Sequence, residues 1–231
     1  RRMVLGIAGS AVLVVLTVST WIQIGYWKDT VSLFAHTLAV TENNDTINFS
    51  LGAAYLKEGK MGPAKEYLMK AVEINPDAYR AHTDLGLILC GEGDIAGGIA
   101  HYRKAIQVAP QFTDPYNNLA VQMIRINNLP EAVSLLTRAI AVDPANGEAY
   151  CNMGLAMANM GKIEDAIPYF EQAVRFSPYS EKVYYNCGLA LGKNGRLDDA
   201  IRYLEGALRI DSSSARAHSG LGLAYMQKGD L

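Results

Sequence analysis

The chain has 231 residues, of which 50% are hydrophobic and 19% charged, and its formal net charge at pH 7 is −2. This length and hydrophobic content allow a large core, and the near-neutral charge without clustered Lys and Arg argues against nucleic acid as a partner. Three cysteines, Cys90, Cys151 and Cys187, show neither a CxxC spacing nor an even number. We therefore expect them to be small, partly buried residues without a disulfide or metal role.

The first predicted element is a membrane-spanning helix at the N-terminus. Arg1 and Arg2 precede a run from Met3 to Tyr26 that contains no charged residue. About 20 such residues span a bilayer, and the run is continuous and β-branched instead of amphipathic, which disfavours a water-soluble helix. A cleaved signal peptide is the alternative, but no small-x-small cleavage site follows the apolar core. We therefore predict a transmembrane helix with its interfacial end over residues 1–27, with residues 3–25 in the membrane.

Residues at the two ends of this run predict its orientation. Trp21, Tyr26 and Trp27 lie where an interfacial aromatic belt is expected, and the two N-terminal arginines mark the opposite, cytoplasmic end. The rest of the chain is therefore expected on the non-cytoplasmic side of a membrane, attached by a single span.

Residues 28–44 are predicted to connect the membrane to the rest of the chain through a helix over 28–41. Phe34 lies four periods of 34 residues before Phe170, so a repeat that is found further along the chain already applies here. We expect this helix to form a half repeat that packs against the end of the membrane helix. The connection would then be a rigid stem and not a flexible tether.

From residue 45 onwards the sequence repeats with a period of 34 residues, as the spacing from Gly154 to Gly188 shows. A period in this range is typical of solenoid proteins. The units follow one another without a linker or a shift in composition, which predicts no second domain. The predicted units are 45–78, 79–112, 113–146, 147–180 and 181–214, followed by 215–231 as the first helix of a truncated sixth unit.

Each unit contains two apolar-periodic segments, such as 148–160 and 163–176, separated in most units by a glycine-containing turn. This pattern predicts a helical hairpin. Gly154 and Ala166 lack large side chains where the two helices cross, and the large Phe170 fills the space towards the next hairpin. One hairpin cannot bury its own apolar face, so stacked neighbours must supply the stability. The sequence therefore predicts an all-α fold.

The recurring residues resemble the tetratricopeptide repeat, whose pattern places Leu-Gly, Tyr, Ala, Phe, Ala and Pro at these spacings. The resemblance covers residues 45–214. It implies a right-handed α-solenoid whose first helices line a concave face that binds partners, and it implies no chemistry by itself.

The position two residues before the recurring glycine points into this concave face, and it carries asparagine in three successive units. A carboxamide has two donors and an acceptor, so it can pair with the C=O and N–H groups of an extended peptide. Repeats of O-GlcNAc transferases carry a similar row of asparagines, which supports a peptide groove here. The alternative is that these residues are solvated and merely tolerate polarity. The asparagine row consists of Asn118, Asn152 and Asn186. The same face also offers Asn117, Arg125, Asn159, Tyr185 and Lys193.

No catalytic constellation is present, and we predict no enzymatic activity for this protein segment, no cofactor and no metal site. His82 and His218 share a repeat position with Tyr116, Tyr150 and Tyr184, so we expect both to be core-facing substitutes for an aromatic residue. None of the histidines has Cys or carboxylate partners at ligand spacing.

Two main hypotheses for the function remain open. The first is a membrane-anchored scaffold that binds a protein or extended peptide through its concave face. The second rests on the junction of Tyr26 to Asp29 with Phe34 and His36, which resembles the C-terminal part of multipass membrane glycosyltransferases of the O-mannosyltransferase type. A catalytic half would then precede Arg1, in line with our expectation that the sequence is a piece of a longer protein. A weaker third hypothesis is an assembly factor for pili or secretion machinery.

Overall fold

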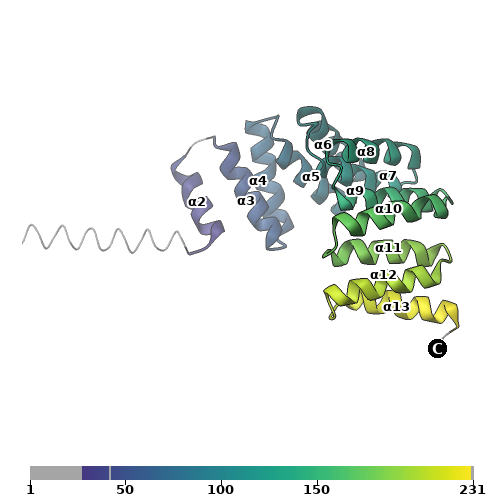
Figure 1. The fold of residues 1–231 in the computed structure, drawn as a ribbon. Coiled ribbons are helices and arrows are strands. Elements are labelled where there is room, and N and C mark those ends of the chain that lie inside the picture. The colour runs from purple at the N-terminus through teal and green to yellow at the C-terminus, as the bar shows by residue number, and fades with distance from the viewer. Residues whose placement is uncertain (1–27, 42, 230–231) are drawn as a thin grey trace, which may run out of the picture. The chain divides into compact units, whose positions relative to one another are not determined.

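The computed structural model describes residues 28–41 and 43–229 (Figure 1). These residues form 12 helices and no strand, which confirms the all-α prediction. None of these helices is long and apolar enough to cross a membrane. The transmembrane helix predicted over residues 3–25, with its interfacial end to residue 27, lies outside the described residues.

The helices alternate between the first and second members of successive hairpins. They follow α2 (Thr30–Val40), a helix inside the predicted range of 28–41. The first helices begin 34 residues apart, except that α7 starts one residue late, where Thr113 is its N-cap. The first helices are α3 (Asp45–Lys57), α5 (Tyr79–Glu92), α7 (Asp114–Arg125), α9 (Gly147–Asn159), α11 (Glu181–Lys193) and α13 (Ala215–Lys228). The second helices are α4 (Met61–Ile74), α6 (Ile95–Val108), α8 (Leu129–Val142), α10 (Ile163–Phe176) and α12 (Leu197–Ile210).

The chain divides into two compact units, the first ending at Glu92 and the second beginning at Gly93. The boundary lies in the turn between α5 and α6, which contains Gly93 and keeps the spacing of the repeat. The prediction of no second domain, made because the sequence shows no linker, stays a prediction. Each unit is described below by itself.

Side-chain caps fix where several first helices begin. Asn146 accepts a hydrogen bond of 2.9 Å from the backbone N–H of Ala149 at the start of α9. Asn44, Ser180 and Ser214 cap α3, α11 and α13 in the same way. A cap of this kind contributes about 1 kcal/mol. In α9 and α11 these caps set the register of the first two turns, which carry Asn152 and Asn186 of the asparagine row.

A residue with positive φ joins the two helices of each hairpin among the described residues. Glycine occupies this position at Gly59, Gly93, Gly161 and Gly195, and Asn127, with a φ of 60°, occupies it between α7 and α8. Glycine adopts this conformation without steric cost, and Asn tolerates it better than most other residues. The predicted glycine-containing turn is therefore confirmed.

The recurring glycine of the first helix lies against a large side chain of the second helix. A Cβ atom added to Gly154 would lie 2.6 Å from Cδ1 of Phe170, which is fully buried. A Cβ on Gly188 would lie 2.8 Å from Cγ of Leu204 in the next hairpin. Phe170 also belongs to the buried cluster that includes Val183 of α11, so it joins its own hairpin to the following one, as predicted.

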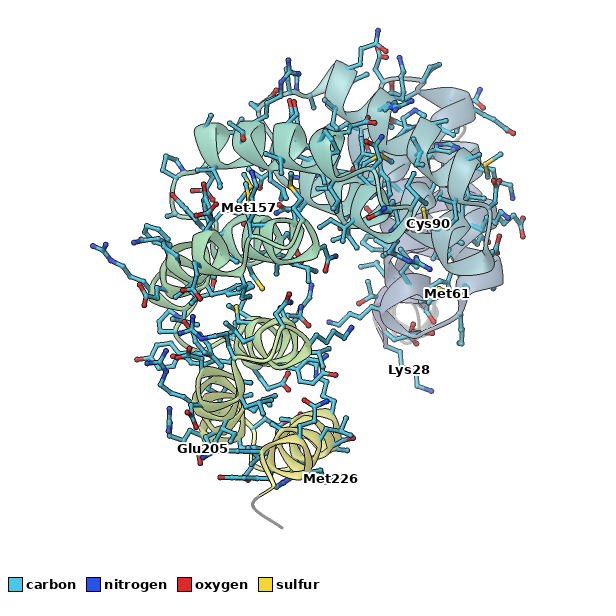
Figure 2. The ribbon with its side chains drawn as sticks, turned by 90° about the vertical axis from the view of Figure 1, so that its right-hand side faces the viewer. Lys28, Met61, Cys90, Met157, Glu205 and Met226 are labelled. Atoms are coloured by element: carbon cyan, nitrogen blue, oxygen red, sulfur yellow. The ribbon has the colours of Figure 1, made fainter. Side chains whose placement is uncertain are left out.

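In the second unit, the first helices contact one another and the second helices do not. Helix α9 contacts α7 and α11, and α11 contacts α13, whereas no contact joins α8 to α10 or α10 to α12 among the described residues. The stack therefore curves with its first helices on the inner side, which is the concave face of this unit. Figure 2 views the last helices of the unit nearly along their axes, with Glu205 marking α12 and Met226 marking α13.

Candidate functional site

All of the residues predicted for the concave face belong to the second unit. They lie on three first helices that contact one another in sequence, so the fold brings them onto neighbouring helices. Asn117, Asn118 and Arg125 lie on α7, Asn152 and Asn159 lie on α9, and Tyr185, Asn186 and Lys193 lie on α11.

Three of these residues form a separate row at the far ends of the helices. Arg125, Asn159 and Lys193 are the last residues of α7, α9 and α11, and all three are exposed. Each helical residue adds about 1.5 Å of length, so Asn159 lies about 10 Å along α9 from Asn152. The structure therefore separates this row from the asparagine row by about two helical turns.

Asn152, the middle residue of the asparagine row, is buried. The residue is only 5% exposed, and its Nδ2 is a buried donor without a hydrogen-bond partner among the described residues. A buried donor left unpaired costs about 1–3 kcal/mol of stability. The amide of Asn152 is therefore a polar group for which the described fold itself supplies no partner.

Asn117 on the neighbouring helix α7 presents the complementary group. Its Nδ2 donates to Oδ1 of Asn146 at 3.4 Å, and Nδ2 of Asn146 donates to Oγ1 of Thr113 at 2.9 Å. Oδ1 of Asn146 also accepts the hydrogen bond that caps α9, which identifies this atom as the oxygen of the Asn146 amide. Asn117 must therefore direct its NH₂ group, and not its oxygen, towards Asn146. Oδ1 of Asn117 is then buried without a partner in the described part of the protein, with the residue 4% exposed.

Asn118 and Asn186, the outer members of the asparagine row, are only partly buried. Neither side chain makes a hydrogen bond to another described residue. Their amides can therefore exchange water for a ligand more freely than that of Asn152.

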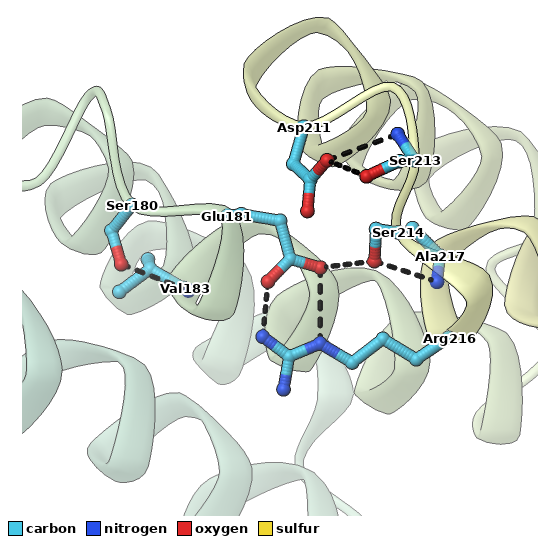
Figure 3. A network of polar contacts seen from close by, with 8 residues as sticks. All are labelled: Ser180, Glu181, Val183, Asp211, Ser213, Ser214, Arg216 and Ala217. Carbon is cyan, nitrogen blue, oxygen red and sulfur yellow. Dashed lines mark hydrogen bonds and ion pairs between the residues drawn. The ribbon is translucent and has the colours of Figure 1, made fainter. Parts of the chain in front are cut away.

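Tyr185 contacts an arginine of the next first helix, α13. The guanidinium of Arg216 on α13 lies 5.0 Å from the centre of its ring. Nε of Arg216 donates to Oε1 of Glu181 at 3.0 Å, and the same oxygen accepts from Oγ of Ser214 at 2.7 Å (Figure 3). Arg216 is the main cause that lowers the pKa of Glu181 below its ordinary value, with Ser214 contributing. The network joins α11 to α13 beside the candidate site.

Sequence reasoning missed the charged residues at the rim of this face. Nζ of Lys182 on α11 lies 2.6 Å from Oε1 of Glu148 on α9. Glu148, Lys182 and Arg216 share one repeat position, so the 34-residue spacing that revealed the asparagines also contained this signal. Because Glu148 and Lys182 are both exposed, their ion pair adds little stability.

Two surface hollows lie away from the asparagine row. One of about 340 Å³ in the first unit lies between the starts of α3 and α5, with Phe49 and Arg80 in its lining. Another of about 270 Å³ in the second unit is lined by Glu171, Tyr203 and Arg209, among others. Both are at or near the lower end of the range for small-molecule pockets. Neither contains a residue predicted from the sequence.

His82 takes the structural role of a tyrosine. Nε2 of His82 lies 3.0 Å from the carbonyl oxygen of Pro76, and the Tyr116 hydroxyl donates to the carbonyl oxygen of Pro110 at 3.2 Å. His82 is buried, as predicted, whereas the prediction of a core-facing His218 is wrong because this side of α13 is exposed. The described residues contain no group of three or more His, Cys, Asp or Glu that could hold a metal ion.

Comparison with known proteins agrees with the repeat pattern. The model of the family described as cilia and flagella-associated protein 70 C-terminal domain matches residues 30–231. No protein with a curated description matches the sequence.

Several solved structures share the fold. YrrB, described as a tetratricopeptide-repeat protein with an unusual peptide-binding site, aligns with a TM-score of 0.58 and 17% identity over 86% of this chain and 98% of its own. TTC0263, a tetratricopeptide-repeat protein of Thermus thermophilus, aligns with a TM-score of 0.70 and 19% identity over 79% of this chain and 100% of its own. The Cut9–Hcn1 structure aligns with a TM-score of 0.74 and 21% identity over 86% of this chain and 40% of its own. Such low identities show the fold alone.

Proposed function

The chain belongs to the family of the cilia and flagella-associated protein 70 C-terminal domain, and we propose that this tetratricopeptide-repeat protein is a scaffold that binds an extended segment of a partner protein. The binding surface is the concave face of the second unit, along α7, α9 and α11. The asparagine row and Asn117 contact the backbone of the ligand, while Tyr185 and the exposed row of Arg125, Asn159 and Lys193 contact its side chains.

The observation that carries this proposal is the pair of buried, unpaired amide atoms on neighbouring first helices. Oδ1 of Asn117 is an acceptor and Nδ2 of Asn152 is a donor, and neither has a partner among the described residues. The backbone of an extended peptide presents an N–H and a C=O at nearly every residue, so it can satisfy both atoms without recognition of particular side chains. Because both atoms are buried in the free protein, binding requires the side chains that cover them to move aside. The description of YrrB as a repeat protein with a peptide-binding site supports a peptide as the class of ligand.

Peptide selection followed by substitution tests the proposal. Peptides are selected from a random displayed library on the purified protein, and their affinities are measured for the wild type and for variants. We expect Asn152→Ala to weaken binding about tenfold, because a hydrogen bond in a desolvated site contributes about 1–2 kcal/mol. The control Gln172→Ala removes an amide from α10, outside the first helices, and should leave affinity unchanged. Unchanged affinity in a triple alanine variant of Asn118, Asn152 and Asn186 would overturn the proposal.

We also propose that residues 3–25 anchor the protein in a membrane, with the repeats on the non-cytoplasmic side. The support is the uncharged run after Arg1 and Arg2, with Trp21 and Trp27 at its other end. Protease treatment of sealed membrane vesicles of known orientation tests this arrangement. Cleavage of the repeats from the cytoplasmic side would contradict it.

The second hypothesis, an acceptor-binding region of a membrane glycosyltransferase, is supported by the junction of Tyr26 to Asp29 with Phe34 and His36. In this case the concave face presents the acceptor protein to a catalytic part elsewhere in a longer protein. The sequence upstream of Arg1 in the gene distinguishes the two hypotheses. Further hydrophobic spans with an acidic motif in an early loop favour the enzyme, and a start codon nearby favours the scaffold.

A further inference from the structure

Two of the three cysteines meet inside the second unit. Cys151 lies on α9 and Cys187 on α11, and their Sγ atoms are 3.4 Å apart. Cys151 is 2% exposed and Cys187 is fully buried. Their spacing of 36 residues, two more than the repeat period, gave no reason to pair them from the sequence.

The local contacts already orient the two side chains towards each other. The Cys187 thiol donates to Sγ of Cys151, and the Cys151 thiol contacts the carbonyl oxygen of Val183 at 3.9 Å. Sulfur atoms in a disulfide are about 2.05 Å apart, so the two atoms need to approach by about 1.4 Å. The two helices contact each other directly, so the bond would join elements that are already neighbours.

We propose that Cys151 and Cys187 form an intramolecular disulfide that links α9 to α11, by exchange with a low-molecular-weight disulfide such as glutathione disulfide. The thiolate of one cysteine attacks glutathione disulfide and releases one glutathione thiolate, which takes up a proton. The second cysteine loses its proton and attacks the mixed disulfide, which releases the other glutathione. The cysteine pair loses two electrons and two protons, and one glutathione disulfide becomes two glutathione thiols.

Burial determines how fast this exchange occurs. Burial is the main cause that raises the pKa of the Cys187 thiol well above its ordinary value, and the hydrogen bond to Cys151 adds to it. The nucleophile is the thiolate, so the folded protein reacts slowly and mainly through local opening of the α9–α11 contact. Exchange should therefore accelerate in mild denaturant.

The position of the bond connects it to the candidate site. Cys151 directly precedes Asn152, and Cys187 directly follows Asn186. If the peptide groove is as proposed above, the bond would fix the distance between two members of the asparagine row. Formation of the disulfide itself does not depend on that groove.

The test measures the equilibrium constant for disulfide formation in the folded protein and compares it with that in the unfolded protein. The purified protein is held in glutathione buffers of stepped thiol-to-disulfide ratio in low urea, which permits local opening without global unfolding. A parallel sample is held in the same buffers with the protein fully unfolded in high urea. Both are quenched with acid and alkylated under denaturing conditions, and mass spectrometry counts the free thiols and maps the cross-linked peptide.

In the folded sample we expect a species that has lost two hydrogen atoms, with Cys151 joined to Cys187 and only Cys90 alkylated. Its equilibrium constant should exceed that of the unfolded sample at least about tenfold, because the fold brings the two thiols together. Cys90→Ser should preserve the bond, and Cys151→Ser or Cys187→Ser should abolish it. An equilibrium constant for the folded protein equal to or below that of the unfolded protein, or a bond that includes Cys90, would overturn the proposal.

Discussion

For Asn152 the sequence predicts the location of the side chain but not its burial. The repeat period places Asn118, Asn152 and Asn186 at one position of successive units, and their location on contacting first helices is confirmed. The period does not show that Asn152 is buried while the other two are only partly buried. That difference depends on the side chains of neighbouring helices, which vary between units although the backbone repeats.

The first prediction concerns the stability of the free protein. Asn152→Leu replaces a buried, unpaired amide with an apolar side chain, so it should raise the free energy of unfolding by about 1 kcal/mol. The same variant should weaken binding of a selected peptide. Urea unfolding without peptide measures the first effect. Asn118→Leu, at the same repeat position but only partly buried, is the control and should change stability less. A loss of stability in Asn152→Leu would show that its amide has a partner within the folded protein.

The second prediction compares two glycines at one repeat position. A Cβ on Gly154 would meet the ring of Phe170, whereas a Cβ on Gly222 of α13 would meet no described atom within 4 Å. Gly154→Ala should therefore destabilise the fold by about 1–3 kcal/mol. Gly222→Ala should stabilise it by up to about 1 kcal/mol, because alanine favours a helix. Thermal and urea unfolding of both variants give the comparison. Equal changes in the free energy of unfolding for the two variants would contradict the described crossing of α9 and α10.

At the level of helices, the hairpins were predictable because their signals are local. Glycine at the turn, proline after the second helix and small residues at the crossing all recur with the period, and the helices begin where the period places them. Contacts between hairpins were less predictable. The Glu181–Arg216 network and the Cys151–Cys187 contact depend on which side chains of different units point at each other. Neither residue pair forms a motif in the sequence.

The third prediction concerns the pH dependence of the contact between α11 and α13. The pKa of Glu181 is lowered mainly by Arg216, so the folded state favours the ionised carboxylate. This contribution is fully present above the ordinary pKa of 4.5 and is lost as the pH falls through the lowered value. Glu181→Gln should therefore destabilise the protein at pH 7 by about 1 kcal/mol, and the difference from the wild type should disappear in acid.

Urea unfolding at several pH values measures this difference. Glu164→Gln is a suitable control, because Glu164 contacts Arg196 but has a 75% exposed side chain. Its effect should be small at every pH. The described network would be contradicted if the loss of unfolding free energy caused by Glu181→Gln became larger as the pH falls, because the network predicts that this loss disappears in acid.

For the whole molecule, the tetratricopeptide-repeat fold follows from the period, and the family match and structural neighbours agree with it. The boundary between the two compact units at Glu92 and Gly93 was not predictable. No change in composition marks it in the sequence, because it lies in a turn that keeps the repeat spacing. The predicted membrane span and the position of the repeats relative to a membrane stay predictions, because residues 1–27 lie outside the described residues.

The most direct test of the proposed function is a crystal structure of the protein bound to a library-selected peptide. The proposal predicts an extended peptide across α7, α9 and α11, with one backbone N–H of the peptide donating to Oδ1 of Asn117 and one backbone carbonyl oxygen accepting from Nδ2 of Asn152. A peptide bound on the second helices, for example in the hollow lined by Glu171 and Arg209, with both amide atoms still unpaired, would contradict it.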